Sequence, residues 1–301
     1  MKQIIKEALK ERKILVSDGA WGTFLQRSGL KPGECPEEWC LSRPDVVKGI
    51  AQSYVSAGSD MIETNSFGAN LFKLAFYGLG DKVSEINEAA AQLSREVAGD
   101  NRWVIASVGP TGKMLIMGDV TEGELYDAFK EQIVALERGG ADAVCIETMT
   151  DADEASIAIR AARENTSMEI IATFTFDDIG EGVYRTMMGI SPTESVAAAI
   201  AAGADIVGAN CGNGLGGMVG IVAEIRDSYP DIPILIHANA GLPRYENGVD
   251  TFPETPEQMA TLVPPVLQAG ANIIGGCCGT TPQHIVAIKR EVDLFKNKTA
   301  I

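Results

Sequence analysis

Residues 269–285 read AGANIIGGCCGTTPQHI, and this stretch combines a helix end, a short strand and the start of another helix. Gly270 follows the helical pattern that ends at Ala269, where a left-handed cap conformation favours glycine. The apolar run 273–276 predicts a strand, and the turn residues 279–282 open a last helix. The stretch is therefore one repeat of an α/β protein, with two adjacent cysteines at the end of its strand.

The same succession of helix, glycine turn and apolar run occurs along the whole chain. Turns at residues 57–60, 139–142 and 202–205 resemble the one at 269–272, and each precedes an apolar run. The predicted strands are residues 14–16, 61–64, 104–108, 143–147, 170–176, 206–209, 234–238 and 273–276. The predicted helices between them are residues 44–57, 83–98, 122–138, 152–164, 192–202, 217–229 and 256–269. Eight such units predict a single (β/α)₈ TIM barrel, an α/β domain formed by residues 1–301, with a doubly wound open sheet as the alternative.

The composition limits the partners that the protein can have. The chain has 41 acidic and 25 basic residues and a net charge of −16, which argues against nucleic acid and anionic membranes. It has no apolar run long enough to span a bilayer, and its first thirteen residues read as a helix rather than a signal peptide. We therefore expect a cytoplasmic protein, in which cysteines are more often metal ligands or buried apolar groups than disulfides.

The cysteine doublet suggests a metal site. Cys277 and Cys278 cannot easily bond to each other, because the disulfide would strain the peptide between them. Two thiolates are half of a soft metal site, and the alternative is that both are buried apolar groups. Cys211 ends the sixth predicted strand, and in a barrel strands six and eight converge on one mouth. Three thiolates leave one position of a tetrahedral Zn²⁺ open, which suits the activation of an incoming thiol.

The remaining cysteines and both histidines have structural interpretations. Cys145 lies inside the fourth predicted strand and is expected in the core, whereas Cys35 and Cys40 are expected to be surface or lid thiols. His284 is expected in the first turn of the last helix. His237 either lines a pocket or is a satisfied core imidazole, and we favour the core imidazole.

Seven segments together resemble the zinc-dependent homocysteine S-methyltransferase family, most closely the homocysteine-binding module of cobalamin-dependent methionine synthases. The segments are DGAWGTFLQ (18–26), ETNSFGAN (63–70), GPTGK (109–113), IET (146–148), NCG (210–212), NAGLP (239–243) and GGCCGTTPQHI (275–285). The resemblance covers essentially the whole chain. The pair of NCG and GGCCGTTP is highly specific, whereas GPTGK alone would be weak.

The resemblance implies a metal centre and a substrate. It implies a (β/α)₈ barrel with Zn²⁺ bound by Cys211, Cys277 and Cys278, and homocysteine sulfur at the fourth zinc position. Asn239 resembles the residue that takes the fourth position when substrate is absent. The implied reaction is transfer of a methyl group to the homocysteine thiolate, which forms methionine.

The resemblance also implies which residues hold the amino-acid part of the substrate. Asp18 and Glu147 match positions that bind its ammonium group, and the backbone at Gly19 with Thr64 and Asn65 resembles the surface that binds its carboxylate. The alternative is that Asp18 only caps the following turn, and that Thr64 and Asn65 tie loops together.

Two local differences from the family and one missing module affect the prediction. Trp21 stands where methionine synthases usually have methionine, and residues 212–217 are unusually rich in glycine, which suggests a flexible loop around the metal. The chain shows no folate- or cobalamin-binding module. We therefore expect methylcobalamin on a separate corrinoid protein as the donor, with S-methylmethionine or a betaine as alternatives. The further alternative is that the chain is a fragment of a longer enzyme. There are two alternative functions. The protein could methylate another thiol, or it could be a non-catalytic partner that binds zinc or a thiol.

Overall fold

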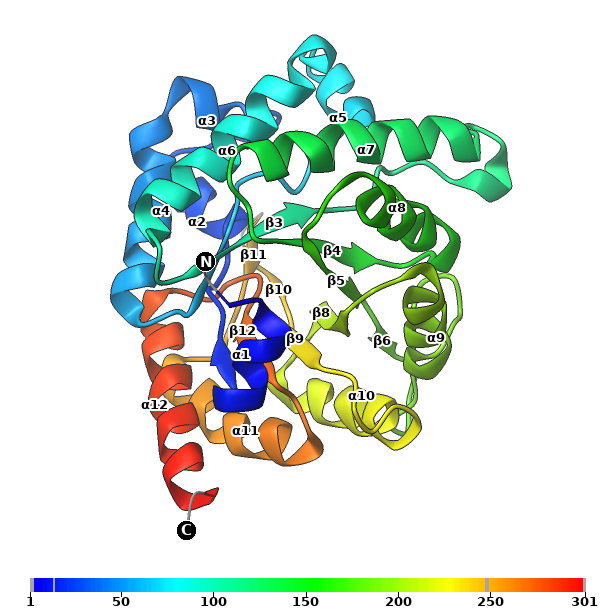
Figure 1. Ribbon diagram of the computed structural model, residues 1–301. Coiled ribbons are helices and arrows are strands. Elements are labelled where there is room, and N and C mark those ends of the chain that lie inside the picture. Colours follow the sequence, from blue (N-terminus) through cyan, green and yellow to red (C-terminus); the bar gives the residue numbers. More distant parts are fainter. Residues whose placement is uncertain (1–2, 13, 247–248, 300–301) are drawn as a thin grey trace.

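Eight parallel strands form one sheet in the computed structural model, which describes residues 3–12, 14–246 and 249–299 (Figure 1). The strands are β1 (Leu15–Val16), β2 (Met61–Glu63), β3 (Trp103–Val108), β4 (Ala143–Met149), β5 (Glu169–Phe174), β8 (Ile206–Gly214), β9 (Ile234–Asn239) and β12 (Ile273–Gly276). Their order in the sheet is β1-β12-β9-β8-β5-β4-β3-β2. Each strand therefore lies beside its neighbour in the chain, as in a (β/α)₈ barrel, and the predicted fold is confirmed.

The barrel closes at β1. This strand pairs with β12, the last strand in the chain, with Leu15 opposite Ile273. On its other side, the Asp60 N–H donates to the Val16 carbonyl oxygen at 2.7 Å, and the Val16 N–H donates to Asp60 Oδ2 at 3.0 Å. In a doubly wound open sheet the first and last strands would not meet in this way, so the alternative fold is wrong.

Helices surround the barrel and connect its strands. They are α4 (Pro44–Ala57), α6 (Val83–Ala98), α7 (Glu122–Arg138), α8 (Ala152–Asn165), α9 (Pro192–Ala202), α10 (Leu215–Ser228), α11 (Pro256–Ala269) and α12 (Pro282–Thr299). Five of the seven predicted inter-strand helices have the predicted bounds. The four glycine turns are confirmed, because Gly58, Gly140, Gly203 and Gly270 all have φ between 96° and 114°.

The barrel interior is apolar at the end where the strands begin. A cluster of buried side chains there takes members from all eight strands and from α1 (Ile5–Arg12). In Figure 1, α1 lies in front of the strands, and its Ile5 and Leu9 pack into this cluster. The N–H groups of Ile5 and Lys6 donate to the Glu169 carboxylate, which satisfies the first turn of the helix. The α1 helix thus closes one end of the barrel and leaves the other for a site.

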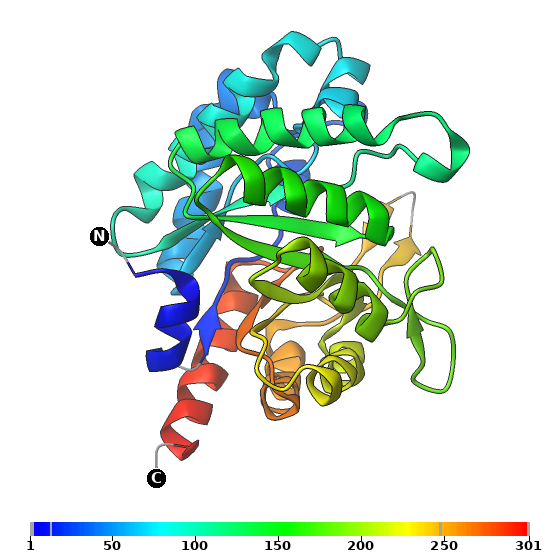
Figure 2. The same ribbon diagram turned by 45° about the vertical axis from the view of Figure 1, so that its right-hand side comes forward.

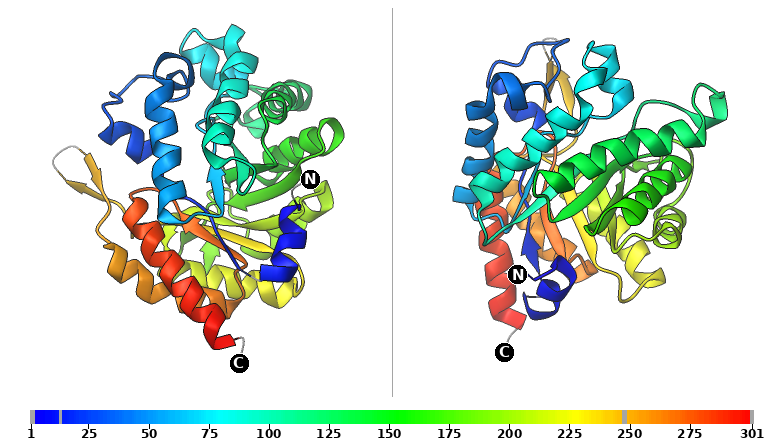
Figure 3. Two further views of the ribbon diagram at one scale, coloured as in Figure 1. Left: turned by 60° about the vertical axis from the view of Figure 1, so that its left-hand side comes forward. Right: turned by 45° about the horizontal axis from the view of Figure 1, so that its top comes forward.

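Several segments project beyond the end of the strands, as Figure 2 shows on its right-hand side. They are the 3₁₀ turn η2 (Leu115–Met117) and the two hairpins β6 (Asp177–Asp178) with β7 (Tyr184–Arg185) and β10 (Arg244–Glu246) with β11 (Val249–Thr251). Figure 3 shows the β10–β11 hairpin and the η2 segment standing away from the helices. These segments surround the mouth of the barrel.

Short helices fill the long loops after β1 and β2, and the sequence did not predict them. They are α2 (Gly22–Arg27), α3 (Trp39–Ser42), α5 (Leu71–Phe76) and the 3₁₀ turn η1 (Gly80–Lys82). Cys35 and Cys40 lie in this region, where they are 6% and 3% exposed. The prediction that they are surface thiols is therefore wrong, whereas a place in a segment beside the cavity is not contradicted, since Pro36 and Glu37 line it. No helix in the described ranges is long and apolar enough to cross a membrane.

Candidate active site

Three cysteines meet at the mouth of the barrel. The Sγ atoms of Cys211, Cys277 and Cys278 all lie within 4.8 Å of one another. Cys211 belongs to β8, and the other two directly follow β12, with β9 between these strands in the sheet. The predicted convergence of these strand ends is thus present in the structure.

A bulge in β8 turns Cys211 toward this cluster. Asn210 of β8 pairs with His237 of β9, and the next pair is Gly214 with Asn239. The register of the two strands therefore shifts between Asn210 and Gly214. Cys211 has a φ of 57° and Gly212 a φ of 65°, which is a costly conformation for the cysteine and typical of functional sites. The predicted flexible loop over 212–217 is therefore wrong, because β8 continues to Gly214 and α10 begins at Leu215.

The cluster fits a soft metal ion. The neighbouring thiols of Cys277 and Cys278 lower the pKa of Cys211, whereas those of Cys211 and Cys278 raise the pKa of Cys277. The Asn239 side chain also lowers the pKa of Cys211, and its buried Oδ1 has no hydrogen-bond partner among the described residues. Three sulfurs and one unpaired oxygen match the donor number of a tetrahedral site. All six cysteines are free.

A cavity of about 270 Å³ opens beside the thiols. Its walls include Gly19, Trp21, Glu37, Glu63, Thr64, Asn65, Ser107, Glu147, Thr148, His237 and the three clustered cysteines. Three of these side chains are acidic, and no lysine or arginine is among the described residues that line it. The cavity therefore favours a ligand that carries a cationic group and disfavours phosphorylated ligands.

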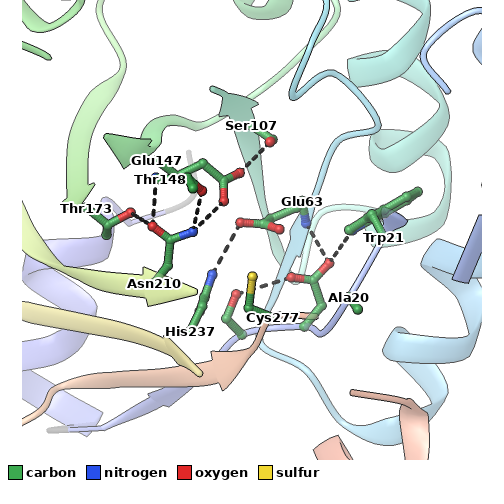
Figure 4. A network of polar contacts seen from close by, with 12 residues as sticks. Ala20, Trp21, Glu63, Ser107, Glu147, Thr148, Thr173, Asn210, His237 and Cys277 are labelled. Carbon is green, nitrogen blue, oxygen red and sulfur yellow. Dashed lines mark hydrogen bonds and ion pairs between the residues drawn. The ribbon is translucent and has the colours of Figure 1, made fainter. Parts of the chain in front are cut away.

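Asn210 organises the side of the cavity formed by β4. Its Nδ2 donates to Glu147 Oε2 at 3.1 Å and to Thr148 Oγ1 at 2.7 Å (Figure 4). Its Oδ1 accepts hydrogen bonds from the Thr148 N–H and from Thr173 Oγ1, both at 2.7 Å. Ser107 Oγ donates to Glu147 Oε1. This network fixes the predicted Glu147 in the cavity wall.

Asp18 lies behind the cavity wall. It is fully buried and is not among the residues that line the cavity. Its Oδ2 accepts hydrogen bonds from Trp21 Nε1 at 3.0 Å and from the Glu63 N–H at 2.8 Å, and Ser17 Oγ donates to its Oδ1 at 3.3 Å. Burial raises the pKa of Asp18 to about 7. Asp18 therefore hydrogen-bonds to two residues of the cavity wall but does not itself line the cavity.

Thr64 and Asn65 line the cavity and also hold loops together. Thr64 Oγ1 accepts a hydrogen bond from the Ser107 N–H at 3.0 Å, and Asn65 Nδ2 donates to the Pro36 carbonyl oxygen at 2.8 Å. Both residues therefore have structural contacts as well as a place in the cavity wall. Gly19 lies in the same wall, and a side chain there would come within 2.9 Å of Tyr54.

His237 and Glu63 face each other across the cavity wall. His237 is 2% exposed, its Nδ1 lies 3.4 Å from Glu63 Oε1, and its Nε2 has no hydrogen-bond partner among the described residues. The favoured interpretation of His237 as a satisfied core imidazole is wrong. Burial lowers the pKa of His237 and raises the pKa of Glu63 and of Glu147 to about 8.

Sequence reasoning assigned no role to Glu63. The signal was present, because Glu63 is a charged residue inside the predicted strand 61–64 and lies at the end of β2, as the other site residues lie at the ends of their strands. Two other predictions are confirmed. Cys145 is fully buried, and His284 Nδ1 accepts a hydrogen bond from the Thr281 N–H at 3.1 Å in the first turn of α12.

Comparisons with known proteins agree with this geometry. A family model described as homocysteine S-methyltransferase matches residues 15–292. Methionine synthases of Mycobacterium tuberculosis and Mycobacterium leprae are 30% and 31% identical to the chain, over 95% and 93% of its length. The chain spans only 25% and 24% of those proteins. The metallated form of the homocysteine methyltransferase MmuM from Escherichia coli has the same fold, with a TM-score of 0.78 and 22% identity over 94% of this chain and 98% of MmuM.

Proposed function

The chain belongs to the homocysteine S-methyltransferase family, and we propose that it transfers a methyl group to the thiol of homocysteine and so forms methionine. The observation that carries the proposal is the meeting of three cysteine sulfurs at one edge of a cavity with acidic walls. Homocysteine fits both features, because it combines a thiol with an ammonium group.

We assign Zn²⁺ to the cluster, with Cys211, Cys277 and Cys278 as its ligands. The unpaired Oδ1 of Asn239 suits the fourth position when no substrate is bound. When bound, Zn²⁺ would lower the pKa of the substrate thiol, so that its sulfur is a nucleophile at neutral pH. The family likeness and the donor set support zinc over harder metals, which prefer oxygen ligands.

The rest of the site would bind and align the substrate. Glu147, held by Asn210 and Ser107, faces the cavity as an acceptor for the ammonium group. The backbone at Gly19, with Thr64 and Asn65, lines the wall that the family resemblance assigns to the carboxylate. Fixing both ends of a short amino acid orients its sulfur for an in-line displacement at the methyl carbon.

We further propose that the methyl donor is a methylcorrinoid carried by a protein. Most of the large apolar side chains that are exposed in the described ranges belong to the segments that follow β2, β3, β5 and β9, at the ends of strands on the side of the barrel that holds the cysteines. This mouth ring consists of Phe67, Leu71, Phe76, Tyr77, Ile116, Met117, Ile179, Val183, Met187, Met188, Leu242 and Tyr245. Only three others are exposed in those ranges, namely Ile4, Val286 and Leu294. A small free donor needs no such surface, whereas a protein that delivers a methyl group to this mouth would cover it.

Metal analysis of single variants tests the zinc assignment. We expect close to one zinc per chain, and the loss of zinc together with homocysteine methylation in Cys211→Ala and in Cys278→Ala. Cys145→Ala is the matched control, because Cys145 is a fully buried thiol outside the cluster and should keep its zinc despite a stability loss of about 1 kcal/mol. A zinc-free protein with full activity would show that the proposed chemistry is wrong.

A donor panel tests the reaction itself. The zinc-loaded protein is given homocysteine with methylcobalamin, S-methylmethionine or glycine betaine, and methionine is measured. Methionine from methylcobalamin alone supports the corrinoid assignment, and methionine from either small donor would replace it. Methylation of other thiols in preference to homocysteine would change the assigned acceptor.

A further inference from the structure

We propose that Asn210 is a positioning residue that fixes the metal ligand Cys211 relative to Glu147, and that this restraint makes the site select homocysteine over a shorter amino thiol. The inference rests on the proposed function, which places the substrate sulfur at the zinc and its ammonium group at Glu147. Asn210 is 1% exposed and is not among the residues that line the cavity, so it acts through its neighbours.

Asn210 joins two strand ends that are not adjacent in the sheet. It belongs to β8, and β5 lies between β8 and β4. Its Nδ2 reaches β4, where it donates to Glu147 Oε2 at 3.1 Å and to Thr148 Oγ1 at 2.7 Å (Figure 4). On β5, Thr173 Oγ1 donates to Asn210 Oδ1 at 2.7 Å. Because Cys211 is the next residue in the chain, this side chain ties the backbone of a metal ligand to the backbone beside Glu147.

Both strand ends contain a bulge with a non-glycine residue in the left-handed region. In β4, the pairing with β5 shifts between residues 146 and 149, and Thr148 has a φ of 59°. In β8, the pairing with β9 shifts after Asn210, and Cys211 has a φ of 57°. The third non-glycine residue with positive φ in the described ranges is Glu181, in the turn between β6 and β7. The two strained residues of the site therefore both adjoin one asparagine.

Asn210 maintains the strained conformation of Thr148. A left-handed backbone is costly for threonine, because its side chain is branched at Cβ. The Thr148 N–H donates to Asn210 Oδ1 at 2.7 Å, and Thr148 Oγ1 accepts from Nδ2, so the amide uses both its acceptor and its donor on this residue. Without the amide, the backbone at Thr148 would relax, and the adjoining Glu147 would move in the cavity wall.

This restraint determines which amino thiols fit the site. Homocysteine and cysteine carry the same ammonium, carboxylate and thiol groups, but cysteine is one methylene shorter. When the metal and Glu147 are fixed relative to each other, the shorter ligand cannot occupy both anchors without moving one of them. Rigid anchors therefore discriminate by length, whereas movable anchors adapt to the shorter ligand.

Calorimetric binding of L-homocysteine and L-cysteine to the zinc-loaded protein tests the inference without a methyl donor. We expect the wild-type protein to bind homocysteine about 10- to 200-fold more tightly, which is the discrimination that one methylene provides. Asn210→Ala should lower this ratio at least about fivefold, because Glu147 is no longer held relative to Cys211. Thr148→Val lacks the acceptor for Asn210 Nδ2 and is not adjacent to a metal ligand. It should lower the ratio in the same direction, even if Asn210→Ala loses its zinc.

Glycine at position 148 tests whether the strained conformation is what the amide maintains. Glycine adopts a positive φ without steric cost, so it does not need the two hydrogen bonds from Asn210. The double variant Asn210→Ala with Thr148→Gly should therefore recover at least about twofold of the ratio that Asn210→Ala loses. A double variant with no recovery would overturn the inference.

Asn272→Ala is the matched control. Asn272 Oδ1 also joins two strands, because it accepts from the Ile234 N–H and from Arg226 Nη2, both at 2.9 Å. It directly precedes β12, however, at the end of the barrel where the strands begin. This variant should lose stability but keep the ratio, and zinc content and thermal melting show whether each variant is folded.

Two results would contradict the role of Asn210. One is equal weakening of both ligands in Asn210→Ala with an unchanged ratio, which would indicate a general structural effect. The other is a wild-type protein that binds both thiols equally well. Failure of the wild-type protein to bind either thiol would instead refute the proposed function.

Discussion

At the scale of single residues, the site depends on carboxyl groups that have no cationic partner. Asp18, Glu63 and Glu147 are all buried, and none forms an ion pair with a lysine or arginine of the described residues. Burial, the largest cause in each case, raises the pKa of Asp18 to about 7 and of Glu63 and Glu147 to about 8. These side chains therefore hold protons near neutral pH until a cationic ligand arrives.

These shifts predict how stability depends on pH. In the unfolded chain the carboxyls bind protons only below about pH 4.5, whereas in the folded protein they keep them up to about pH 7–8. The folded state binds more protons between these limits, so their contribution to the free energy of unfolding is full at low pH and is lost as pH rises toward 8. Glu63→Gln, which cannot lose a proton, should reduce that loss by on the order of 1–3 kcal/mol.

Urea unfolding of the zinc-saturated protein at pH 5, 6.5 and 8 measures this difference. Comparing variants at equal pH removes the pH dependence of zinc binding. Asp127→Asn, on the exposed face of α7, serves as the control and should follow the wild-type profile. If Glu63→Gln followed the wild-type profile as well, the raised pKa of Glu63 would be wrong.

The sequence predicted part of this site and missed the rest for a physical reason. The three cysteines and Glu147 were predictable because each follows or ends an apolar run, and the ends of parallel strands converge. Which carboxylate faces the cavity was not predictable. That depends on a contact between Trp21 and Asp18 and on a β9 histidine, and neither the local pattern nor strand counting reveals such contacts.

At the scale of elements, β8 differs from the other strands in its geometry. Its register with β9 shifts beyond Asn210, and two successive residues, Cys211 and Gly212, have positive φ. The remaining strands and the long helices were predictable from apolar runs and glycine caps. The bulge, the short helices α2, α3 and α5 and the two hairpins were not, because elements of this length are stabilised by tertiary contacts rather than by local propensity.

Substitutions at two glycines test the bulge and the following helix independently. A side chain at Gly212, which has a φ of 65°, would come within 2.7 Å of the Phe176 carbonyl oxygen. Gly212→Ala should therefore lower the free energy of unfolding by about 1–3 kcal/mol and weaken zinc retention, because Cys211 moves with the backbone. Gly216 lies in the first turn of α10 with open space around its Cα, so Gly216→Ala should keep its zinc and gain up to about 1 kcal/mol.

Zinc content after dialysis against a weak chelator and urea unfolding give the two readouts for these glycines. Equal zinc retention in Gly212→Ala and Gly216→Ala would mean that the bulge does not position Cys211.

At the scale of the whole molecule, the two ends of the barrel are different. The α1 helix packs into the apolar cluster at one end, and the three cysteines, the cavity and the mouth ring occupy the other. The number of βα units predicted the barrel, but only the pairing of β1 with β12 distinguishes it from an open sheet. The mouth ring could not be predicted, since exposure of an apolar side chain depends on how the projecting segments pack.

If the mouth ring binds the protein that carries the methyl donor, substitutions in the ring should slow turnover with that protein. Ile116 and Met117, at the tip of η2, are 76% and 73% exposed and lie away from the cavity-lining residues. Replacing both by serine should lower kcat/KM for a purified methylcorrinoid protein at least about tenfold, because apolar anchors contribute most to protein interfaces. Turnover with free methylcobalamin should not change, since the thiol site is intact.

The outer helix α12 supplies the control for this experiment. Val286 and Leu294 on α12 are 52% and 46% exposed, and the double serine variant there removes exposed apolar side chains that lie outside the mouth ring. This control variant should leave kcat/KM unchanged with both donors. An equal loss of kcat/KM with both donors in the η2 variant would indicate damage at the active site. If the wild-type protein sedimented as a dimer and the η2 variant as a monomer, the mouth ring would instead be the contact between two copies of the chain. A net charge of −16 on each chain opposes self-association, so we expect the partner to be a less acidic protein.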